Sequence, residues 1–335
     1  MKIKKIEKLF ILKFLIFLSF FYTAFLLINV LVDPLWYFKG NRIGETNYVF
    51  NERLSKFNHF YYGKNDVNYD CLLFGSSVST TINQEKFKNN TCFNFSFSAG
   101  KIKDYLVYLE YLKFLNLIPE IIYLELPIDI TNKDLQYYSL LRKSFPNLEI
   151  VSYIPPVSTK QLFSNTNLVR NDLNKNEDKN LIPVFIKDVK KPDKFWKHYV
   201  SFNSFSFSIK SLMHLSNYTN AYDKNFISFV RRNKVGKPKL NIEKQLISEN
   251  YINYLAHERI QASKYFNKTF DFSVPNKAIN NEVNTYDGSH YYENFISKLP
   301  IIMETYKLEF GLIVNDNNYK KQFISSANLY LKNKK

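Results

Sequence analysis

The sequence predicts an α/β domain built around a parallel β-sheet and preceded by one membrane-spanning helix. Two patterns predict this fold class. A long apolar segment follows a lysine-rich N-terminus, and further along the chain short apolar runs alternate with segments of helical periodicity. Strands that alternate with helices form parallel sheets, because the crossover between two parallel strands is usually a helix.

The apolar segment covers residues 14–32, within a predicted transmembrane anchor of residues 9–32. Its length is close to the roughly 20 residues that a helix needs to cross a bilayer. Lysines precede it and aromatic residues follow it, which predicts a cytoplasmic N-terminus and a main domain outside the cytoplasm. The alternative is a cleaved signal peptide, but the apolar core of such a peptide is usually about 7–15 residues long. No A-x-A-like cleavage site follows the run, so we expect an uncleaved anchor.

Composition divides the chain into consecutive predicted parts. These are a cytoplasmic tail (1–8), the anchor (9–32), a polar and aromatic connector (33–66), the folded domain (67–310) and a polar C-terminal tail (311–335). Inside the domain, residues 131–240 are rich in Asn, Lys and Ser and only weakly periodic. We expect this stretch to be a long insertion that carries local helices.

Short apolar runs at residues 69–74, 91–95 and 121–126 predict three buried strands. Helical periodicity predicts helices over 103–117 and 242–266, and over an amphipathic stretch that ends near residue 306. The first of these helices lies between the second and third strands, as a parallel sheet requires.

The formal net charge of the 335-residue chain is +16 at pH 7. Lysines are spread over the whole sequence, with no arginine-rich stripe and no nucleic-acid motif, so the charge indicates an anionic surface or glycan rather than a nucleic acid. The histidines show no metal-ligand spacing, so we expect no metal and no cofactor.

The two cysteines, Cys71 and Cys92, lie in the first two predicted strands. An oxidising compartment would permit a disulfide between them. Adjacent parallel strands rarely give the required Cα distance and converging Cβ directions, however. We therefore expect two buried free thiols.

Ser77 follows the first predicted strand in the string Gly75-Ser76-Ser77. Open α/β sheets bind their ligands at the carboxyl ends of the strands, and a helix N-terminus there would favour an oxyanion. The same string also fits an ordinary turn or a helix N-cap. Near the other end of the chain, Asp287 and His290 form a D-x-x-H turn. A serine hydroxyl needs a base such as histidine to become a nucleophile, and a carboxylate can fix the tautomer of that histidine.

Taken together and in this order, these two motifs resemble the first and last signature blocks of the SGNH (GDSL-like) hydrolases. The resemblance implies a three-layer α/β/α domain of flavodoxin-like strand order, with Ser77 as the nucleophile, His290 as the base and Asp287 as the acid that orients it. The string FNFSFSAG, residues 93–100, resembles the second block. It implies an oxyanion hole formed by the backbone N–H groups of Ser77 and Gly100.

The sequence departs from the family at the third block, where SGNH hydrolases usually have a G-x-N-D motif whose asparagine donates to the oxyanion. After the third predicted strand this chain reads LELPID, residues 124–129, without an asparagine. Many membrane-anchored relatives that act on envelope polysaccharides or teichoic acids also depart from this block.

The resemblance implies serine-dependent acyl-ester chemistry, by an O-acyltransferase or an esterase, on a cell-envelope glycan. With the anchor, it implies a single-pass protein of the bacterial cytoplasmic membrane. Analogy with anchored relatives adds a multi-pass membrane acyltransferase as a partner. The rival hypothesis is a catalytically weak SGNH-fold subunit that binds or assembles an envelope polysaccharide modification system. The missing asparagine favours this rival, whereas the presence of all three triad residue types opposes it.

The charge pattern around the anchor predicts the topology of the chain. A reporter that is active only in the cytoplasm should be silent when it is fused to the C-terminus, and the same reporter fused to the N-terminus should be active. Strong cytoplasmic activity of the C-terminal fusion would contradict the predicted location of the domain.

Overall fold

The computed structural model describes residues 2–33, 36–38, 42–43, 52–64, 66–162, 249–285, 290–315 and 317–332. The chain divides into two compact units, residues 1–67 with 196–226, and residues 68–195 with 227–335. Most of the predicted insertion, from residue 163 to residue 240, lies outside the described residues, as does Asp287.

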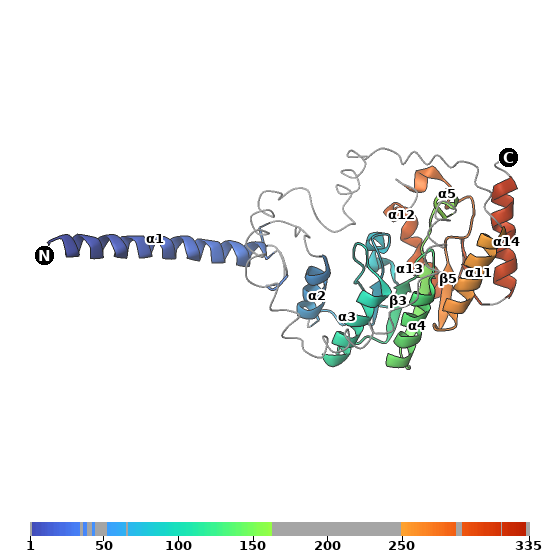
Figure 1. Ribbon diagram of the computed structural model, residues 1–335, viewed down its shortest axis with the longest axis horizontal. Helices are drawn as coiled ribbons and strands as arrows, with labels where there is room; N and C mark the ends of the chain where they lie inside the picture. The colour runs from blue at the N-terminus through green and yellow to red at the C-terminus, as the bar shows by residue number, and fades with distance from the viewer. Residues whose placement is uncertain are drawn as a thin grey trace. The chain divides into compact units, whose positions relative to one another are not determined.

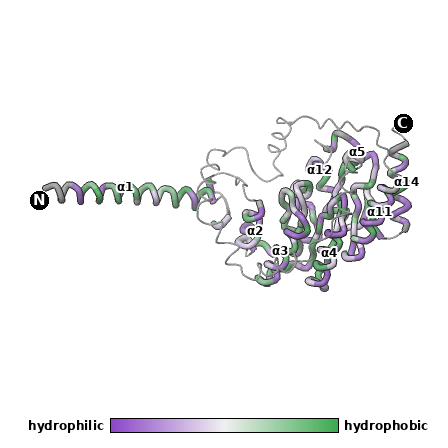
Figure 2. Tube along the Cα trace, in the orientation of Figure 1, coloured by the Kyte–Doolittle hydropathy of each residue, from purple (hydrophilic) through white to green (hydrophobic). Residues whose placement is uncertain are grey.

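The first unit contains α1 (Lys2–Val32), which is long and apolar enough over Glu7–Val32 to cross a membrane. Figure 1 shows α1 as a single uninterrupted helix, and Figure 2 shows hydrophobic residues along most of it. The residues of the predicted cytoplasmic tail belong to the same helix from Lys2 onward. The long apolar segment was therefore predicted correctly as one helix, and its lysine-bearing start continues the same helix.

The first unit also contains α2 (Glu52–Gly63), and described residues just after α1 contact it. The Asp33 carboxylate accepts hydrogen bonds from the backbone N–H groups of Tyr37 and Phe38, both at 2.7 Å. The Trp36 ring stacks on the His59 ring of α2, with 3.9 Å between the ring centroids. Burial, followed by the charge of Lys56, lowers the pKa of His59 to about 4, so the ring that Trp36 covers is neutral at neutral pH. The predicted connector thus contains a helix.

The second unit is an α/β domain with a six-stranded, mostly parallel sheet in the order β2-β1-β3-β4-β5-β6. The strands are β1 (Cys71–Phe74), β2 (Cys92–Asn94), β3 (Ile121–Glu125), β4 (Glu149–Ile154), β5 (Lys268–Asp271) and β6 (Leu312–Ile313). All neighbouring pairs are parallel except β5 and β6. The sheet confirms the predicted α/β class and the three strands that the sequence indicated.

Helices lie between and after the strands of this sheet (Figure 1). They are α3 (Ile102–Phe114), α4 (Asn132–Ser144), α5 (Thr159–Leu162), α11 (Glu249–Ser263), α12 (Glu293–Ile296), α13 (Lys298–Thr305) and α14 (Asn317–Lys332). Side-chain hydrogen bonds determine where some of these helices begin. Thr131 and Asp134 form a reciprocal capping box at the start of α4, which satisfies two backbone N–H groups there.

The strands are apolar because side chains pack against both faces of the sheet. Cys71 and Leu73 of β1 belong to a buried cluster with residues of α12 and α13. Successive side chains of a strand point to opposite faces, and Phe74 contacts Tyr105 of α3, with 5.4 Å between the ring centroids. Strand β1 is therefore buried on both faces, and its carboxyl end is fixed within the domain.

Cys71 and Cys92 form a disulfide, so the expected pair of free thiols is a wrong prediction. The physical reason is register. The two residues are direct partners on the adjacent parallel strands β1 and β2, with their Cα atoms 4.6 Å apart. This distance lies in the usual disulfide range of about 4.4–6.8 Å. Direct partners in register also place their Cβ atoms on the same face of the sheet.

Two predicted boundaries are corrected by the packing of the second unit. The segment from residue 132 to residue 162 belongs to the core rather than to an insertion, because β4 lies between β3 and β5. The predicted C-terminal tail contains β6 and α14. Tyr319, Phe323 and Ala327 of α14 are buried and pack in one cluster with α11. The polar residues that suggested a loose tail alternate with these three at helical spacing.

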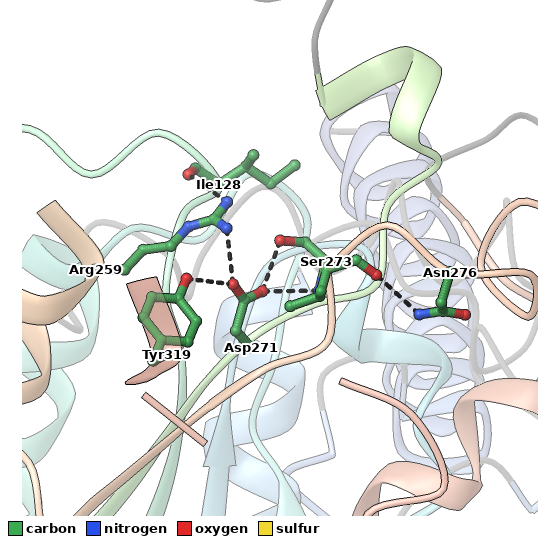
Figure 3. Close-up of polar contacts among 7 residues, drawn as sticks. Ile128, Arg259, Asp271, Ser273, Asn276 and Tyr319 are labelled. Carbon is green, nitrogen blue, oxygen red and sulfur yellow. Dashed lines mark hydrogen bonds and ion pairs between the residues drawn. The ribbon is translucent and has the colours of Figure 1, made fainter. Parts of the chain in front are cut away.

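A buried polar network ties β5, α11 and α14 together (Figure 3). The Asp271 carboxylate, at the end of β5, forms an ion pair with the Arg259 guanidinium at 2.7 Å, and both side chains are fully buried. It also accepts hydrogen bonds from the Tyr319 hydroxyl and from the Ser273 hydroxyl, both at 2.7 Å. The Arg259 guanidinium also packs 4.7 Å from the centre of the Phe323 ring. This network fixes the last parallel strand against two helices from distant parts of the sequence.

Replacing Asp271 by alanine should lower the free energy of unfolding by about 3–5 kcal/mol, because the Arg259 guanidinium would stay buried without its partner. Urea unfolding measures the loss. The Lys298–Glu309 pair is a control, since its side chains are 47% and 61% exposed. Glu309→Ala should cost less than about 1 kcal/mol. Similar losses in both variants would contradict the assigned role of the buried pair.

Candidate active site

Ser77 and His290 lie in contact although 213 residues separate them in the sequence. The Ser77 Oγ atom is 3.0 Å from the His290 Nε2 atom, and both side chains are partly exposed. Ser77 follows the carboxyl end of β1. The two residues lie within hydrogen-bond distance, as the sequence predicted, and the tautomer of the histidine decides which of them is the donor. The orienting role of Asp287 stays a prediction, because residues 286–289 lie outside the described residues.

Backbone and side-chain hydrogen bonds hold both partners of this pair. On the serine side, the backbone N–H groups of Ser79 and Thr80 donate to the Ser76 carbonyl oxygen, at 3.1 and 3.2 Å. The Thr80 hydroxyl donates to the Ser77 carbonyl oxygen at 2.7 Å. This tight turn opens η1 (Ser79–Thr81) and presents the Ser77 side chain beyond the strand end.

On the histidine side, Tyr291, the residue that follows His290, forms an isolated antiparallel bridge with Thr285. The Thr285 hydroxyl donates to the His290 carbonyl oxygen at 2.9 Å. The Tyr291 ring is buried, and its hydroxyl donates to the Ile279 carbonyl oxygen at 2.8 Å. His290 is thus carried by a loop whose next residue is anchored in the core.

The backbone N–H of Ser77 has no hydrogen-bond acceptor among the residues that the structure describes. It lies at the start of the turn that leads into η1. Its contribution to an oxyanion hole stays a prediction.

Gly100 does not fit its predicted role as an oxyanion donor. Its backbone N–H donates to the Phe97 carbonyl oxygen at 3.0 Å and is engaged in a turn. A Cβ atom at this position would lie 2.8 Å from the Gly75 carbonyl oxygen and 2.9 Å from the Tyr105 ring. The glycine is required for this close approach of two strand ends. The sequence showed that a glycine is present but not where its N–H points.

Glu125 is the residue of this region that the sequence did not reveal as part of the site. It ends β3, at the place where SGNH hydrolases have their third block. Its carboxylate accepts the Ser76 backbone N–H at 2.9 Å and the Ser76 hydroxyl at 2.5 Å, and it also accepts the Ser79 hydroxyl. The sequence feature that could have indicated this role is an acidic residue at the end of an apolar strand.

The surroundings of the Glu125 carboxylate change its titration. The residue as a whole keeps some exposed surface, but the carboxylate lies among the side chains of Ser76, Ser79 and Tyr153. Desolvation raises the pKa of Glu125, while hydrogen bonds from Ser76 and Ser79 and the charge of His290 oppose the rise. The net direction is upward, so burial outweighs the stabilising contacts.

Gly75 provides the space in which Glu125 approaches the turn. A Cβ atom at Gly75 would lie 2.6 Å from the Glu125 Oε2 atom and 2.5 Å from the Ser79 Oγ atom, and it would also clash with the Ser79 Cβ atom. Within the Gly-Ser-Ser string, the glycine admits the carboxylate, the first serine binds it, and the second serine faces His290.

In the part of the chain that the structure describes, no three His, Cys, Asp or Glu side chains are grouped closely enough to hold a metal ion. No protein-family model, curated protein or solved structure gives a significant match to this chain.

Adding a methyl group at Gly75 should displace Ser79 or Glu125 and lower the free energy of unfolding by about 1–3 kcal/mol, the usual cost of overpacking. Urea unfolding of Gly75→Ala tests this expectation. Gly63→Ala is the control, because its Cβ atom would meet only the His59 ring, at 3.8 Å, which is an ordinary contact. A Gly75→Ala variant as stable as the original chain would show that the space is not tightly filled.

Proposed function

We propose that this chain is a membrane-anchored, extracytoplasmic enzyme of the SGNH type that performs serine-dependent acyl-ester chemistry on a cell-envelope glycan. The observation that carries the proposal is the 3.0 Å approach of Ser77 Oγ to His290 Nε2. It occurs next to the carboxyl end of β1, and ligands of open α/β sheets bind at the carboxyl ends of the strands.

The chemistry follows from the two side chains and one backbone donor. His290 takes the proton of the Ser77 hydroxyl while the serine oxygen attacks the acyl carbonyl carbon. The carbonyl oxygen becomes an oxyanion that the Ser77 backbone N–H stabilises. The carbon–oxygen bond to the leaving alcohol then breaks, and that alcohol takes the proton from the histidine. Water or a sugar hydroxyl resolves the acyl-enzyme by the same steps in reverse, with Asp287 holding the imidazole tautomer.

The strand order supports the finer fold assignment. The first five strands follow the order 2-1-3-4-5, which is that of flavodoxin-like sheets. Side chains of β1 pack with α12 and α13 on one face and with α3 on the other. These contacts support a three-layer α/β/α domain, which is the arrangement implied by the resemblance to SGNH hydrolases.

The proposed location rests on three features. Helix α1 can serve as a single-pass anchor of the bacterial cytoplasmic membrane. The Cys71–Cys92 disulfide favours an oxidising compartment outside the cytoplasm. The net charge of +16 favours a negatively charged envelope glycan as the substrate or the acyl acceptor. A multi-pass membrane acyltransferase as the source of the acyl group is an analogy with other anchored enzymes.

The rival function is a catalytically weak subunit that binds or assembles components of a glycan modification system. One observation favours it. The Gly100 N–H is engaged in a turn and the third block has no asparagine, so two of the expected oxyanion donors are missing. The contact between Ser77 and His290 favours the enzyme, because a binding subunit has no need of a base beside a serine hydroxyl.

A fluorophosphonate probe tests the enzymatic proposal directly, since it reacts with activated serines. The full chain in detergent should be labelled on Ser77, and Ser77→Ala should abolish the labelling. Asp287→Asn should slow it by orders of magnitude, because the imidazole loses its tautomer control. Ser144→Ala, at the far end of α4, is the matched control and should be labelled normally. Labelling that persists in Ser77→Ala, or its absence in the original chain, would favour the binding subunit.

A further inference from the structure

A cluster of four polar side chains lies directly beside the proposed nucleophile. It consists of Glu125 at the end of β3, Ser76 and Ser79 in the turn after β1, and Tyr153 in β4, and we call it the Glu125 cluster. The turn that carries Ser77 begins and ends at the two serines of this cluster. The mechanism proposed above uses none of the four side chains, and family resemblance assigns no role to them.

All hydrogen bonds in the Glu125 cluster are directed toward the carboxylate. The Ser76 N–H and the Ser79 hydroxyl donate to its Oε2 atom, and the Ser76 hydroxyl donates to its Oε1 atom. The Ser79 oxygen lies 2.5 Å from the Tyr153 hydroxyl. When the Ser79 hydroxyl donates to Glu125, the Tyr153 hydroxyl can donate to Ser79. Burial, and then the charge of Glu125, raise the pKa of Tyr153 well above its usual value, so Tyr153 remains a neutral donor.

When it is ionised, the carboxylate has only acceptors to offer, so it accepts from the Ser76 N–H and from both serine hydroxyls. The bonds are charge-assisted, a class about twice as strong as neutral hydrogen bonds. They bind residues on both sides of Ser77, one residue before it and two residues after it. The carboxylate thus restrains the direction in which the Ser77 side chain leaves the backbone.

The carboxylate has no Lys or Arg partner in the described part of the chain. The titratable groups that face it are Tyr105 of α3, Tyr138 of α4, Tyr153 of β4 and His290. Of these, only the histidine can carry a positive charge. The contrast with Asp271 is direct, since that buried carboxylate has its own arginine. A desolvated carboxylate without a cation costs stability, and such costs are retained mainly at functional sites.

We propose that Glu125 is a positioning residue of the reaction, which holds the Ser76–Ser79 turn so that the Ser77 Oγ atom faces His290. This inference rests on the proposed function. It assigns a positioning role to Glu125, the last residue of β3. Where SGNH hydrolases usually use an asparagine to bind the oxyanion, this chain uses a glutamate to fix the nucleophile from the opposite side of the turn.

The role of Glu125 predicts how stability and activity change with pH. The pKa of Glu125 is raised in the folded chain, so the folded state binds its proton more tightly than the unfolded state does. The contribution of this group to stability is therefore most favourable in acid and declines as pH rises through the raised pKa. Activity should change in the opposite direction. A protonated carboxyl donates one hydrogen bond itself, so it can no longer accept all three hydrogen bonds from Ser76 and Ser79.

Glu125→Gln separates the two effects. The amide has the same shape, and its oxygen can still accept from Ser76 N–H and Ser79, but the charge is gone. Fluorophosphonate labelling of Ser77 at neutral pH should be about tenfold slower, the effect of losing one hydrogen bond to a charged group. The midpoint of urea unfolding should be equal to or higher than that of the original chain. On the acid side, the logarithm of the labelling rate should fall less steeply as the pH is lowered, because the glutamine at position 125 does not titrate.

Two further variants complete the experiment. Adding Ser76→Ala to Glu125→Gln should slow labelling by less than Ser76→Ala does alone, because the two residues act as a unit. Glu304→Gln is the matched control, since Glu304 also accepts N–H groups of a loop, those of Lys88 and Asn89, but at the amino ends of the strands. It should leave the labelling rate unchanged.

The possible failures are distinguishable. If the original chain is not labelled on Ser77, the proposed function fails and the inference fails with it. If the original chain is labelled, and Glu125→Gln is labelled at the same rate with the same pH dependence in acid, only the inference is overturned. A slower rate that is accompanied by a lower unfolding midpoint would make Glu125 a structural residue and would also overturn it.

Discussion

Strand β1 is hydrogen-bonded on both sides, to β2 and to β3, and the rest of the domain depends on this fixed register. Cys71 pairs with Cys92 on one side and with Ile121 on the other. A slip of one residue would turn every side chain of the strand to the opposite face. The register therefore determines at once which residues form the core, where the disulfide closes, and where the turn that carries Ser77 leaves the sheet.

Asp271 and Glu125 are desolvated carboxylates that illustrate different solutions to the same electrostatic problem. Asp271 is neutralised by Arg259 and serves to join β5 to α11 and α14. Glu125 is surrounded by hydroxyl and amide donors, and the positive group that acts on it is the histidine of the proposed catalytic pair. The first arrangement joins β5 rigidly to two helices. The second leaves a desolvated carboxylate beside the proposed nucleophile.

The sequence was most informative where one strand or helix had a strong local pattern. The first three strands, the helix between the second and third, and the contact of Ser77 with His290 followed from apolar runs and from two motifs. Strands β4 and β5 were missed, because EIVSYI contains polar residues and KTFD is short, and only their place in the sheet makes them strands. The disulfide was missed because register is not visible in either strand alone. The direction of the Gly100 N–H and the role of Glu125 depend on contacts between strand ends, which no local pattern encodes.

The position of α14 has a consequence for the biogenesis of the domain. Tyr319 donates to Asp271, and Phe323 covers Arg259, so the buried ion pair is enclosed only when the helix has docked. Helix α14 follows every other element of the domain in the sequence. Synthesis from the N-terminus produces this helix after the other described elements. Until it docks, the side of the ion pair that Tyr319 and Phe323 cover stays open to water, so the buried network is completed only when nearly the whole described domain has been made.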